Sequence, residues 1–226
     1  DLRVYEEELV SDPLAMLISG TSLAVLYTLL LGDIFQLKAE SAFGYSLGEI
    51  SMLFASRVWT DAEEVSAALR CSELFKTRLA GPQNAVRSYW GLPLSAPEDQ
   101  SEPIWENVLL IASPEKVRDA IASEERVYLT HINTPAQVVI GGDPQGCRRV
   151  VSSLKVHSIR APFTDAIHNP AIASEFKEMV SLFSWPIERR PDWNLYFSAA
   201  NHQPAQFTRA AVADLLAQGL CTCLNF

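Results

Sequence analysis

A serine in this sequence stands between two glycines, at a spacing that nucleophilic serines use. The run reads Ala-Phe-Gly44-Tyr-Ser46-Leu-Gly48-Glu. A strand end, a Gly-x-Ser-x-Gly turn and a helix start would expose the hydroxyl of Ser46 and aim neighbouring backbone N–H groups at one point. We expect Gly44 and Gly48 to be required, because strand and helix approach too closely there for a Cβ atom. A match this short also occurs by chance, so the rest of the chain must decide.

A serine nucleophile needs a base within hydrogen-bond reach and donors for the oxyanion. The backbone N–H of Leu47, the next residue, is the expected donor. Of the four histidines, His168 is our candidate base, because it lies in an irregular segment that could return to the serine; the alternative is a structural loop histidine. His131, at a predicted strand end, is a weaker candidate for substrate contact. We expect His157 to be structural and His202 to lie in a surface turn.

The composition argues against several classes of function. The chain has 226 residues, 48% hydrophobic and 20% charged, which is typical of a soluble globular protein with one large or two modest domains. Its formal net charge of −9 argues against nucleic acid as a partner, because phosphate binding relies on clustered Lys and Arg. The four cysteines are scattered and lack the second pair of a zinc site. We therefore expect reduced thiols, no metal and a cytoplasmic location.

The uncharged segment 14–32 is long enough to raise the question of a transmembrane helix. It contains several Ser and Thr residues, lacks flanking basic clusters and follows acidic residues, which argues against both a membrane span and a signal peptide. We expect instead a helix buried within an α/β core, entered at Asp12-Pro13.

The elements that must position the serine and the histidine follow two different sequence patterns. Residues 107–160 read as strand, helix, strand, strand, helix, strand, the pattern of a ferredoxin-like sandwich. The pattern on either side predicts further strands and helices at 41–45, 47–57, 62–79, 171–183, 193–199 and 208–220. We therefore predict an α/β fold in which a large α/β-hydrolase-like subdomain with a parallel sheet, residues 1–104 and 161–226, is interrupted by a small ferredoxin-like (βαββαβ) subdomain at 105–160.

Three blocks of this sequence resemble malonyl-CoA:acyl-carrier-protein transacylases and the acyltransferase domains of polyketide and fatty-acid synthases. Residues 44–49 are similar to the family's Gly-His-Ser-x-Gly-Glu signature, and residues 133–141 to its Asn-x-x-x-Gln-x-Val-Ile-x-Gly block. Residues 165–170 stand where a third block ends in the catalytic histidine. The blocks keep the family's order. Tyr45 and the Phe-Lys-Thr-Arg-Leu-Ala-Gly-Pro run at 75–82 further resemble the acyltransferase-like domains of polyunsaturated-fatty-acid and heterocyst-glycolipid synthases.

The resemblance implies an acyltransferase in which Ser46 is acylated from an acyl-CoA, with His168 as general base and Leu47 as oxyanion donor. The acyl group then passes to the phosphopantetheine thiol of an acyl carrier protein, so no cofactor is bound to the chain itself. The family orients its histidine by a backbone carbonyl, expected here at 198–199. Glu49 is expected to anchor the elbow helix.

The family also pairs an arginine after the elbow with the malonyl carboxylate. Arg70 is the candidate, although it lies one residue short of the usual spacing, and Arg78 is the fallback. If neither faces Ser46, the acyl group carries no carboxylate. The family has histidine where this chain has Tyr45, which leaves the identity of the acyl group open. The other substrate-binding residues that the resemblance implies are Tyr45, Asn133 and Gln137.

The ends of the chain lead to a further expectation. The family's first strand and its Gly-Gln-Gly loop have no counterpart before residue 1, so we expect a fragment truncated at both ends, cut from a multidomain synthase with a ketosynthase among its neighbouring domains. Because that loop supplies a second oxyanion donor, the isolated segment should be weak or inactive. Carrier docking would use a basic patch, with Arg148, Arg149 and Lys155 as candidates.

Two other functions stay open. An α/β-hydrolase esterase or thioesterase shares the Gly-x-Ser-x-Gly turn, although the βαββαβ pattern and the block at 133–141 argue against it. A catalytically silent acyltransferase-like domain, with a structural or docking role, is the other alternative.

Overall fold

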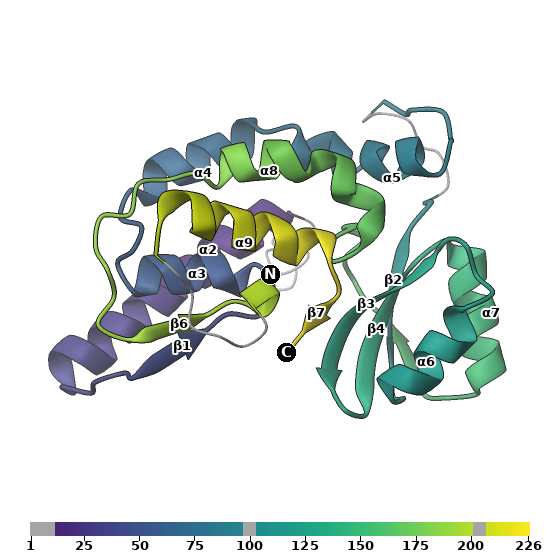
Figure 1. Ribbon diagram of the computed structural model, residues 1–226, viewed down its shortest axis with the longest axis horizontal. Helices are drawn as coiled ribbons and strands as arrows, with labels where there is room; N and C mark the ends of the chain where they lie inside the picture. Colours follow the sequence, from purple (N-terminus) through teal and green to yellow (C-terminus); the bar gives the residue numbers. More distant parts are fainter. Residues whose placement is uncertain (1–11, 97–102, 201–206) are drawn as a thin grey trace, which may run out of the picture. The chain divides into compact units, whose positions relative to one another are not determined.

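The computed structural model describes residues 12–96, 103–200 and 207–226, which form a mixed α/β fold (Figure 1). The predicted α/β class is confirmed. Contacts divide the chain into two compact units, the first comprising Asp1–Ser72 and Lys177–Gly219 and the second Glu73–Phe176 and Leu220–Phe226. The predicted subdomain boundaries at 104 and 160 stay a prediction.

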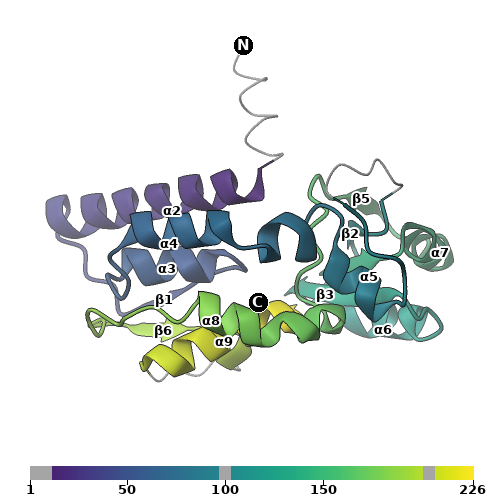
Figure 2. The ribbon, with the colours of Figure 1, turned by 90° about the horizontal axis from the view of Figure 1, so that it is seen from above.

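A pair of short parallel strands lies at the centre of the first unit. Strand β1 (Ser41–Phe43) pairs with β6 (Asn194–Tyr196), and Figure 2 shows α2 and α3 on one side of this pair and α9 on the other. The helical elements of this unit are α2 (Pro13–Leu29), the π-helical turn η1 (Leu30–Ile34), α3 (Gly48–Ala55), α4 (Ala62–Cys71), α8 (Phe176–Leu182), the 3₁₀ turn η4 (Ser198–Ala200) and α9 (Arg209–Cys221).

Helix α2 is largely exposed, so the expectation of a buried helix was wrong. It begins at Pro13, as predicted, and the Asp12 side chain caps its N-terminus. One face packs against α3, where Leu17 is buried and the hydroxyls of Thr21 and Ser51 lie 3.0 Å apart. Apolar residues are spread around the whole helix, so the sequence does not show that only one face packs against another described element. The large apolar side chains exposed on this helix are Met16, Leu23, Leu26, Tyr27 and Leu29.

By length and composition, Leu14–Ile34 is the one stretch of the described chain that could cross a membrane, and 6% of its most apolar window is buried. Core helices of soluble proteins and signal sequences have the same length and composition. The expectation that this chain does not span a membrane therefore stays a prediction.

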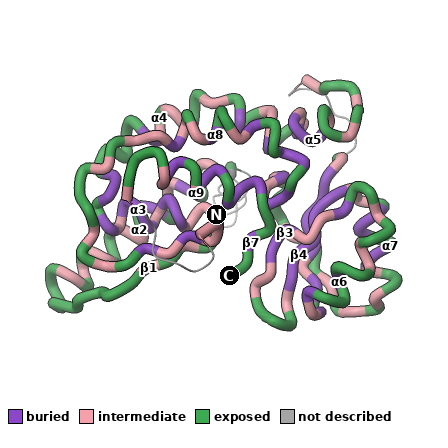
Figure 3. Tube along the Cα trace, viewed as in Figure 1, coloured by how far each residue is buried: buried purple, intermediate pink, exposed green. Residues whose placement is uncertain are grey.

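The second unit contains the βαββαβ order that the sequence predicts. Strands β2 (Glu106–Leu110), β3 (Val127–Thr134), β4 (Gln137–Gly142) and β5 (Ser158–Arg160) pair antiparallel in the order β5-β2-β4-β3. Helices α6 (Pro114–Ile121) and α7 (Pro144–Leu154) pack on one face of this sheet (Figure 1). Strands β2 and β4 are buried along most of their length (Figure 3). The core between sheet and helices includes Val108, Leu110, Val117, Val138, Ile140 and Val150.

Several elements of both units depart from the sequence prediction. The helix expected at 62–79 ends at Cys71, because Ser72 adopts an extended backbone, and a π-helical turn η2 (Leu74–Arg78) follows. The helix expected at 171–183 divides into the 3₁₀ turn η3 (Pro170–Glu175) and α8. A short helix α5 (Asn84–Tyr89) and a strand β7 (Leu224–Asn225), which pairs parallel to β3, were not predicted.

Candidate active site

The strand, turn and helix predicted around Ser46 are all observed in the first unit. Strand β1 ends at Phe43 and α3 begins at Gly48, and between them Ser46 has a φ of +56°, in the left-handed region. The N–H of Gly48 donates to the carbonyl of Tyr45 at 2.9 Å and closes the turn. Residues other than glycine rarely adopt this φ, and such strain concentrates at functional sites.

Only one of the two glycines is required by close approach. A Cβ atom on Gly44 would overlap the backbone of Gly48 and the N–H of Glu49, so no other residue fits there without moving α3 away from β1. A Cβ atom on Gly48 would meet nothing within 4 Å. The expectation for Gly48 was therefore wrong, because open space surrounds that side of the helix start.

The start of α3 presents one backbone donor to the elbow. The N–H groups of Gly48 and Glu49 are taken by the carbonyls of Tyr45 and Ser46, at 2.9 and 3.0 Å. The N–H of Leu47, the N-cap of α3, donates to no acceptor among the described residues. This arrangement suits the oxyanion donor that the sequence predicts at Leu47.

Glu49 anchors the elbow helix to the chain that follows β6. Its carboxylate accepts a hydrogen bond from the N–H of Ser198 at 2.7 Å, and its side chain is buried. Burial raises the pKa of Glu49 to about 7, although the hydrogen bond from Ser198 favours the charged form. The predicted anchoring role is confirmed. Ser198 begins the turn η4 rather than ending a strand, and the orienting carbonyl at 198–199 stays a prediction.

His168 lies in the second unit, immediately before the turn η3. It is 2% exposed, has a φ of +59°, and donates its backbone N–H to the carbonyl of Leu220 at 2.6 Å. Its imidazole packs edge-on against that of His131, with ring centroids 4.7 Å apart. This pairing was not predicted, because the two residues lie in different elements and nothing in the sequence links them.

His131 is a buried neighbour of the candidate base. Burial, with a smaller contribution from His168, lowers the pKa of His131 to about 3, so its imidazole is neutral at physiological pH. Its Nδ1 lies 2.9 Å from the hydroxyl of Thr130. Of the other two histidines, His157 precedes β5 and is exposed, and its backbone carbonyl accepts from the N–H of Ile111 at 3.0 Å; its structural role stays a prediction. His202 lies outside the described residues.

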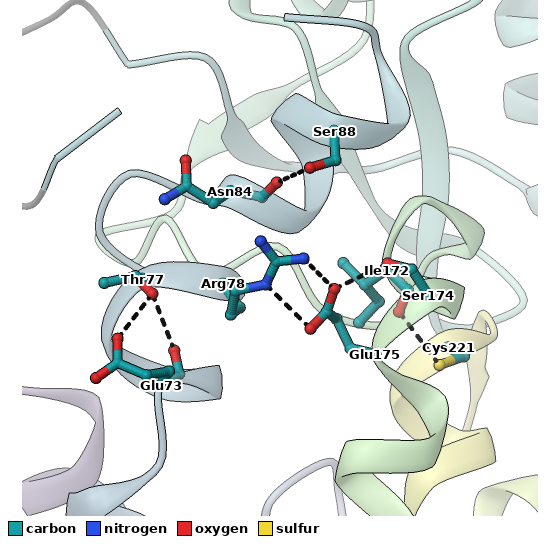
Figure 4. Close-up of polar contacts among 9 residues, drawn as sticks. All are labelled: Glu73, Thr77, Arg78, Asn84, Ser88, Ile172, Ser174, Glu175 and Cys221. Carbon is teal, nitrogen blue, oxygen red and sulfur yellow. Dashed lines mark hydrogen bonds and ion pairs between the residues drawn. The ribbon is translucent and has the colours of Figure 1, made fainter. Parts of the chain in front are cut away.

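The two candidate arginines have different surroundings. Arg70 is exposed in the last turn of α4, in the unit that contains Ser46. Arg78 forms a two-pronged ion pair with Glu175 in the second unit, with Nε 3.0 Å from Oε2 and Nη2 bonded to Oε1 (Figure 4). Burial alone would raise the pKa of Glu175, but Arg78 and Ser174 outweigh it and hold that pKa below its usual range. Because Arg78 already binds an internal carboxylate, Arg70 is the better candidate for a substrate.

The remaining predicted site residues are divided between the units. Tyr45 is 41% exposed beside Ser46. Asn133 and Gln137 flank the turn from β3 to β4, where the Asn133 amide donates to Gln137 Oε1 at 3.3 Å. No group of three His, Cys, Asp or Glu side chains able to hold a metal occurs in the described part of the chain.

The chain matches no family model. It is 27% identical over 205 residues to one of the subunits of a polyunsaturated fatty acid synthase from Thraustochytrium sp. (strain ATCC 26185 / S-3). The match covers 88% of this chain but only 10% of that protein, so the chain spans about a tenth of its relative's length.

Solved structures share the fold at low sequence identity. The malonyl-CoA:acyl carrier protein transacylase of Helicobacter pylori has a TM-score of 0.73 and 16% identity, over 96% of this chain and 65% of that one. A malonyl-transacylase in complex with its type II polyketide synthase acyl-carrier protein has a TM-score of 0.73 and 15% identity, over 97% of this chain and 66% of that one. The acyltransferase domain from the second module of the salinomycin polyketide synthase has a TM-score of 0.69 and 16% identity, over 97% of this chain and 46% of that one. The chain thus has the fold of these acyltransferases, as the sequence blocks implied.

Proposed function

We propose that this chain is an acyltransferase that moves an acyl group, of malonyl type, from CoA to an acyl carrier protein through a serine acyl-enzyme. The observation that carries the proposal is the elbow at Ser46, with its left-handed φ between β1 and α3, in a chain with the acyltransferase fold. Glycine would relieve the backbone strain at this position, so a serine there is best explained by its hydroxyl.

In the proposed first half-reaction, His168 takes the proton of the Ser46 hydroxyl while the serine oxygen attacks the thioester carbonyl. The Leu47 N–H binds the oxyanion. When the intermediate collapses, the CoA thiolate leaves and takes up the proton from His168. The thiol of the carrier's phosphopantetheine then attacks the acyl-serine with the same base and donor. Because His131 is neutral, His168 does not face a second positive charge when it is protonated.

The substrate contacts are part of the same proposal. Arg70 would pair with the carboxylate of a malonyl-type group, and Tyr45, Asn133 and Gln137 would contact the acyl-CoA. Arg70→Ala should raise the KM for malonyl-CoA without a similar effect on the KM for acetyl-CoA, because only the malonyl group carries a carboxylate that Arg70 could bind.

The proposed partners are an acyl carrier protein and neighbouring synthase domains, a ketosynthase among them. Of the three candidate docking residues, Arg149 is held by Glu124 through two hydrogen bonds of 2.8 and 2.6 Å. Arg148 and Lys155 are exposed on and beside α7 and are the stronger candidates. A cytoplasmic location and the absence of a bound cofactor also stay part of the proposal.

The test uses the full-length protein and a panel of acyl-CoA thioesters, with mass spectrometry of the peptide that contains Ser46. We expect a stable acyl adduct on Ser46 that only a carrier thiol releases, and no adduct in Ser46→Ala. Rapid release by water would favour the esterase or thioesterase alternative. If no thioester gives an adduct and Ser46→Ala leaves the parent protein fully productive, the domain is catalytically silent and the proposal fails.

A further inference from the structure

An irregular segment carries His168, and side chains from elsewhere in the second unit hold its shape. Residues 161–167 belong to no helix or strand, so their backbone groups need other partners. The N–H of Ala166 donates to the carbonyl of Leu79 at 2.9 Å, and the amide of Gln83 donates to the carbonyl of Thr164 at 2.5 Å. The N–H of Ala161 donates to a backbone carbonyl of β2 at 2.8 Å, and two further contacts come from one buried side-chain amide.

That amide belongs to Asn107 on β2, which is 2% exposed. Its Nδ2 donates to the carbonyl of Phe163 at 3.2 Å and to that of Asp165 at 3.1 Å. Its neighbour Val108 belongs to the core beneath α6 and α7. Because side chains alternate along a strand, Asn107 lies on the opposite face of the sheet.

The orientation of this amide is set by an indole. Trp105 is fully buried, and its Nε1–H donates to Asn107 Oδ1 at 3.0 Å. An indole N–H can only donate, so Oδ1 must face Trp105 and both N–H groups of Nδ2 must face the segment. The indole is itself fixed by stacking against Trp90 and Tyr128, with centroids 6.0 and 5.8 Å away.

The sequence block at 133–141 makes room for this pair. A Cβ atom on Gly141 would lie 2.7 Å from Asn107 Oδ1 and 2.6 Å from Cζ2 of Trp105. Glycine at this position is therefore required by the Trp105–Asn107 pair on the neighbouring strand.

We infer that Asn107 is a positioning residue for the candidate base: its amide holds the segment 163–165 in the shape that places His168. The inference rests on the proposed function for its effect on catalysis. His168 has a left-handed φ and is therefore held by its surroundings. The Asn107 amide supplies two of the contacts that constrain this segment. They are made to the carbonyls of Phe163 and Asp165, which lie five and three residues before His168.

The test is Asn107→Asp in the full-length protein. Aspartate keeps the size and the acceptor for Trp105, but places an oxygen without a hydrogen against two carbonyl oxygens. We expect the rate of acylation at Ser46 to fall about 10- to 100-fold, while the KM for the acyl-CoA changes less than about threefold, because displacement of a catalytic group acts on the chemical step. Trp105→Phe keeps the stacking but frees the amide to rotate, and should lower the same rate by a smaller factor.

Asn84→Asp is the matched control. The Asn84 amide donates to the carbonyl of Ser95 and accepts from its N–H, both at 3.0 Å, and so clamps a different loop of the same unit. We expect wild-type acylation from this variant.

A second readout does not depend on catalysis. Diethyl pyrocarbonate modifies accessible neutral histidines, and its attack on buried His168 can be followed by peptide mass spectrometry. We expect faster modification of His168 in Asn107→Asp than in wild type or in Asn84→Asp. If Ser46 is never acylated in wild type, the proposed function fails, and this readout still decides whether Asn107 holds the segment. Wild-type acylation and wild-type modification in a folded Asn107→Asp, or equal losses in both variants, would overturn the inference.

Discussion

Glu49→Gln is expected to make the protein more stable at alkaline pH and to leave its stability at acid pH unchanged. Glu49 is 3% exposed, and its carboxylate accepts a hydrogen bond from the N–H of Ser198 at 2.7 Å. A glutamine has nearly the same shape as the protonated acid and keeps an oxygen for that bond. The two side chains therefore differ mainly in whether position 49 can become charged.

The size of the effect follows from the pKa. Burial raises the pKa of Glu49 from 4.5 to about 7 in the folded protein. A group with a raised folded pKa contributes stability that is fully present below about pH 4.5 and is lost as the pH rises through 7. Each pKa unit corresponds to about 1.4 kcal/mol, so the loss approaches about 3 kcal/mol by pH 8.5. The glutamine variant has no such loss.

Urea unfolding of both proteins at pH 4.5, 6, 7 and 8.5 measures the difference. We expect the free energy of unfolding of Glu49→Gln, minus that of wild type, to lie near zero at pH 4.5 and to rise to about 3 kcal/mol at pH 8.5. Because the two proteins share all their other titratable groups, subtracting one free energy of unfolding from the other cancels the contributions of those groups. Glu63→Gln, at an exposed position in the first turn of α4, is the control for the same substitution outside the core. A difference for Glu49→Gln that does not change with pH would refute the reasoning.

Three further predictions concern stability and are read by urea unfolding. Gly44→Ala should lower the free energy of unfolding by about 1–3 kcal/mol or more, because its Cβ overlaps backbone, whereas Gly48→Ala should change it by less than about 1 kcal/mol; equal effects would contradict the elbow geometry. Arg78→Ala should cost about 3–5 kcal/mol by leaving the Glu175 carboxylate buried without its partner, and adding Glu175→Gln should recover most of this loss; no recovery would show that the charge is not the cause. Because the folded pKa of His131 is about 3, its contribution is present above about pH 6.5 and is lost as the pH falls toward 3. Wild type should therefore lose more stability than His131→Gln between pH 7 and pH 4, and parallel curves would contradict the neutral, buried imidazole.

Features that depend on a few neighbouring residues could be predicted from the sequence. The elbow at Ser46, the entry to α2 at Asp12-Pro13 and the βαββαβ order at 106–160 all depend on local preferences: glycine at a crowded turn, proline in a first helical turn, and short apolar runs between breakers. The acyltransferase fold could be inferred because its sequence blocks are local as well.

Other features could be identified only from the tertiary structure, because they depend on contacts between segments that are distant in the sequence. The apolar run of α2 did not reveal that one face has no described neighbour, and the glycine pattern did not reveal that only Gly44 is crowded. The edge-on pair of His131 and His168, and the engagement of Arg78 by Glu175, join side chains from different elements. The sequence also showed no sign of the role of Asn107, because its partners are backbone carbonyls more than fifty residues away. Every residue has a backbone carbonyl, so residue types do not indicate which one a side chain will bind.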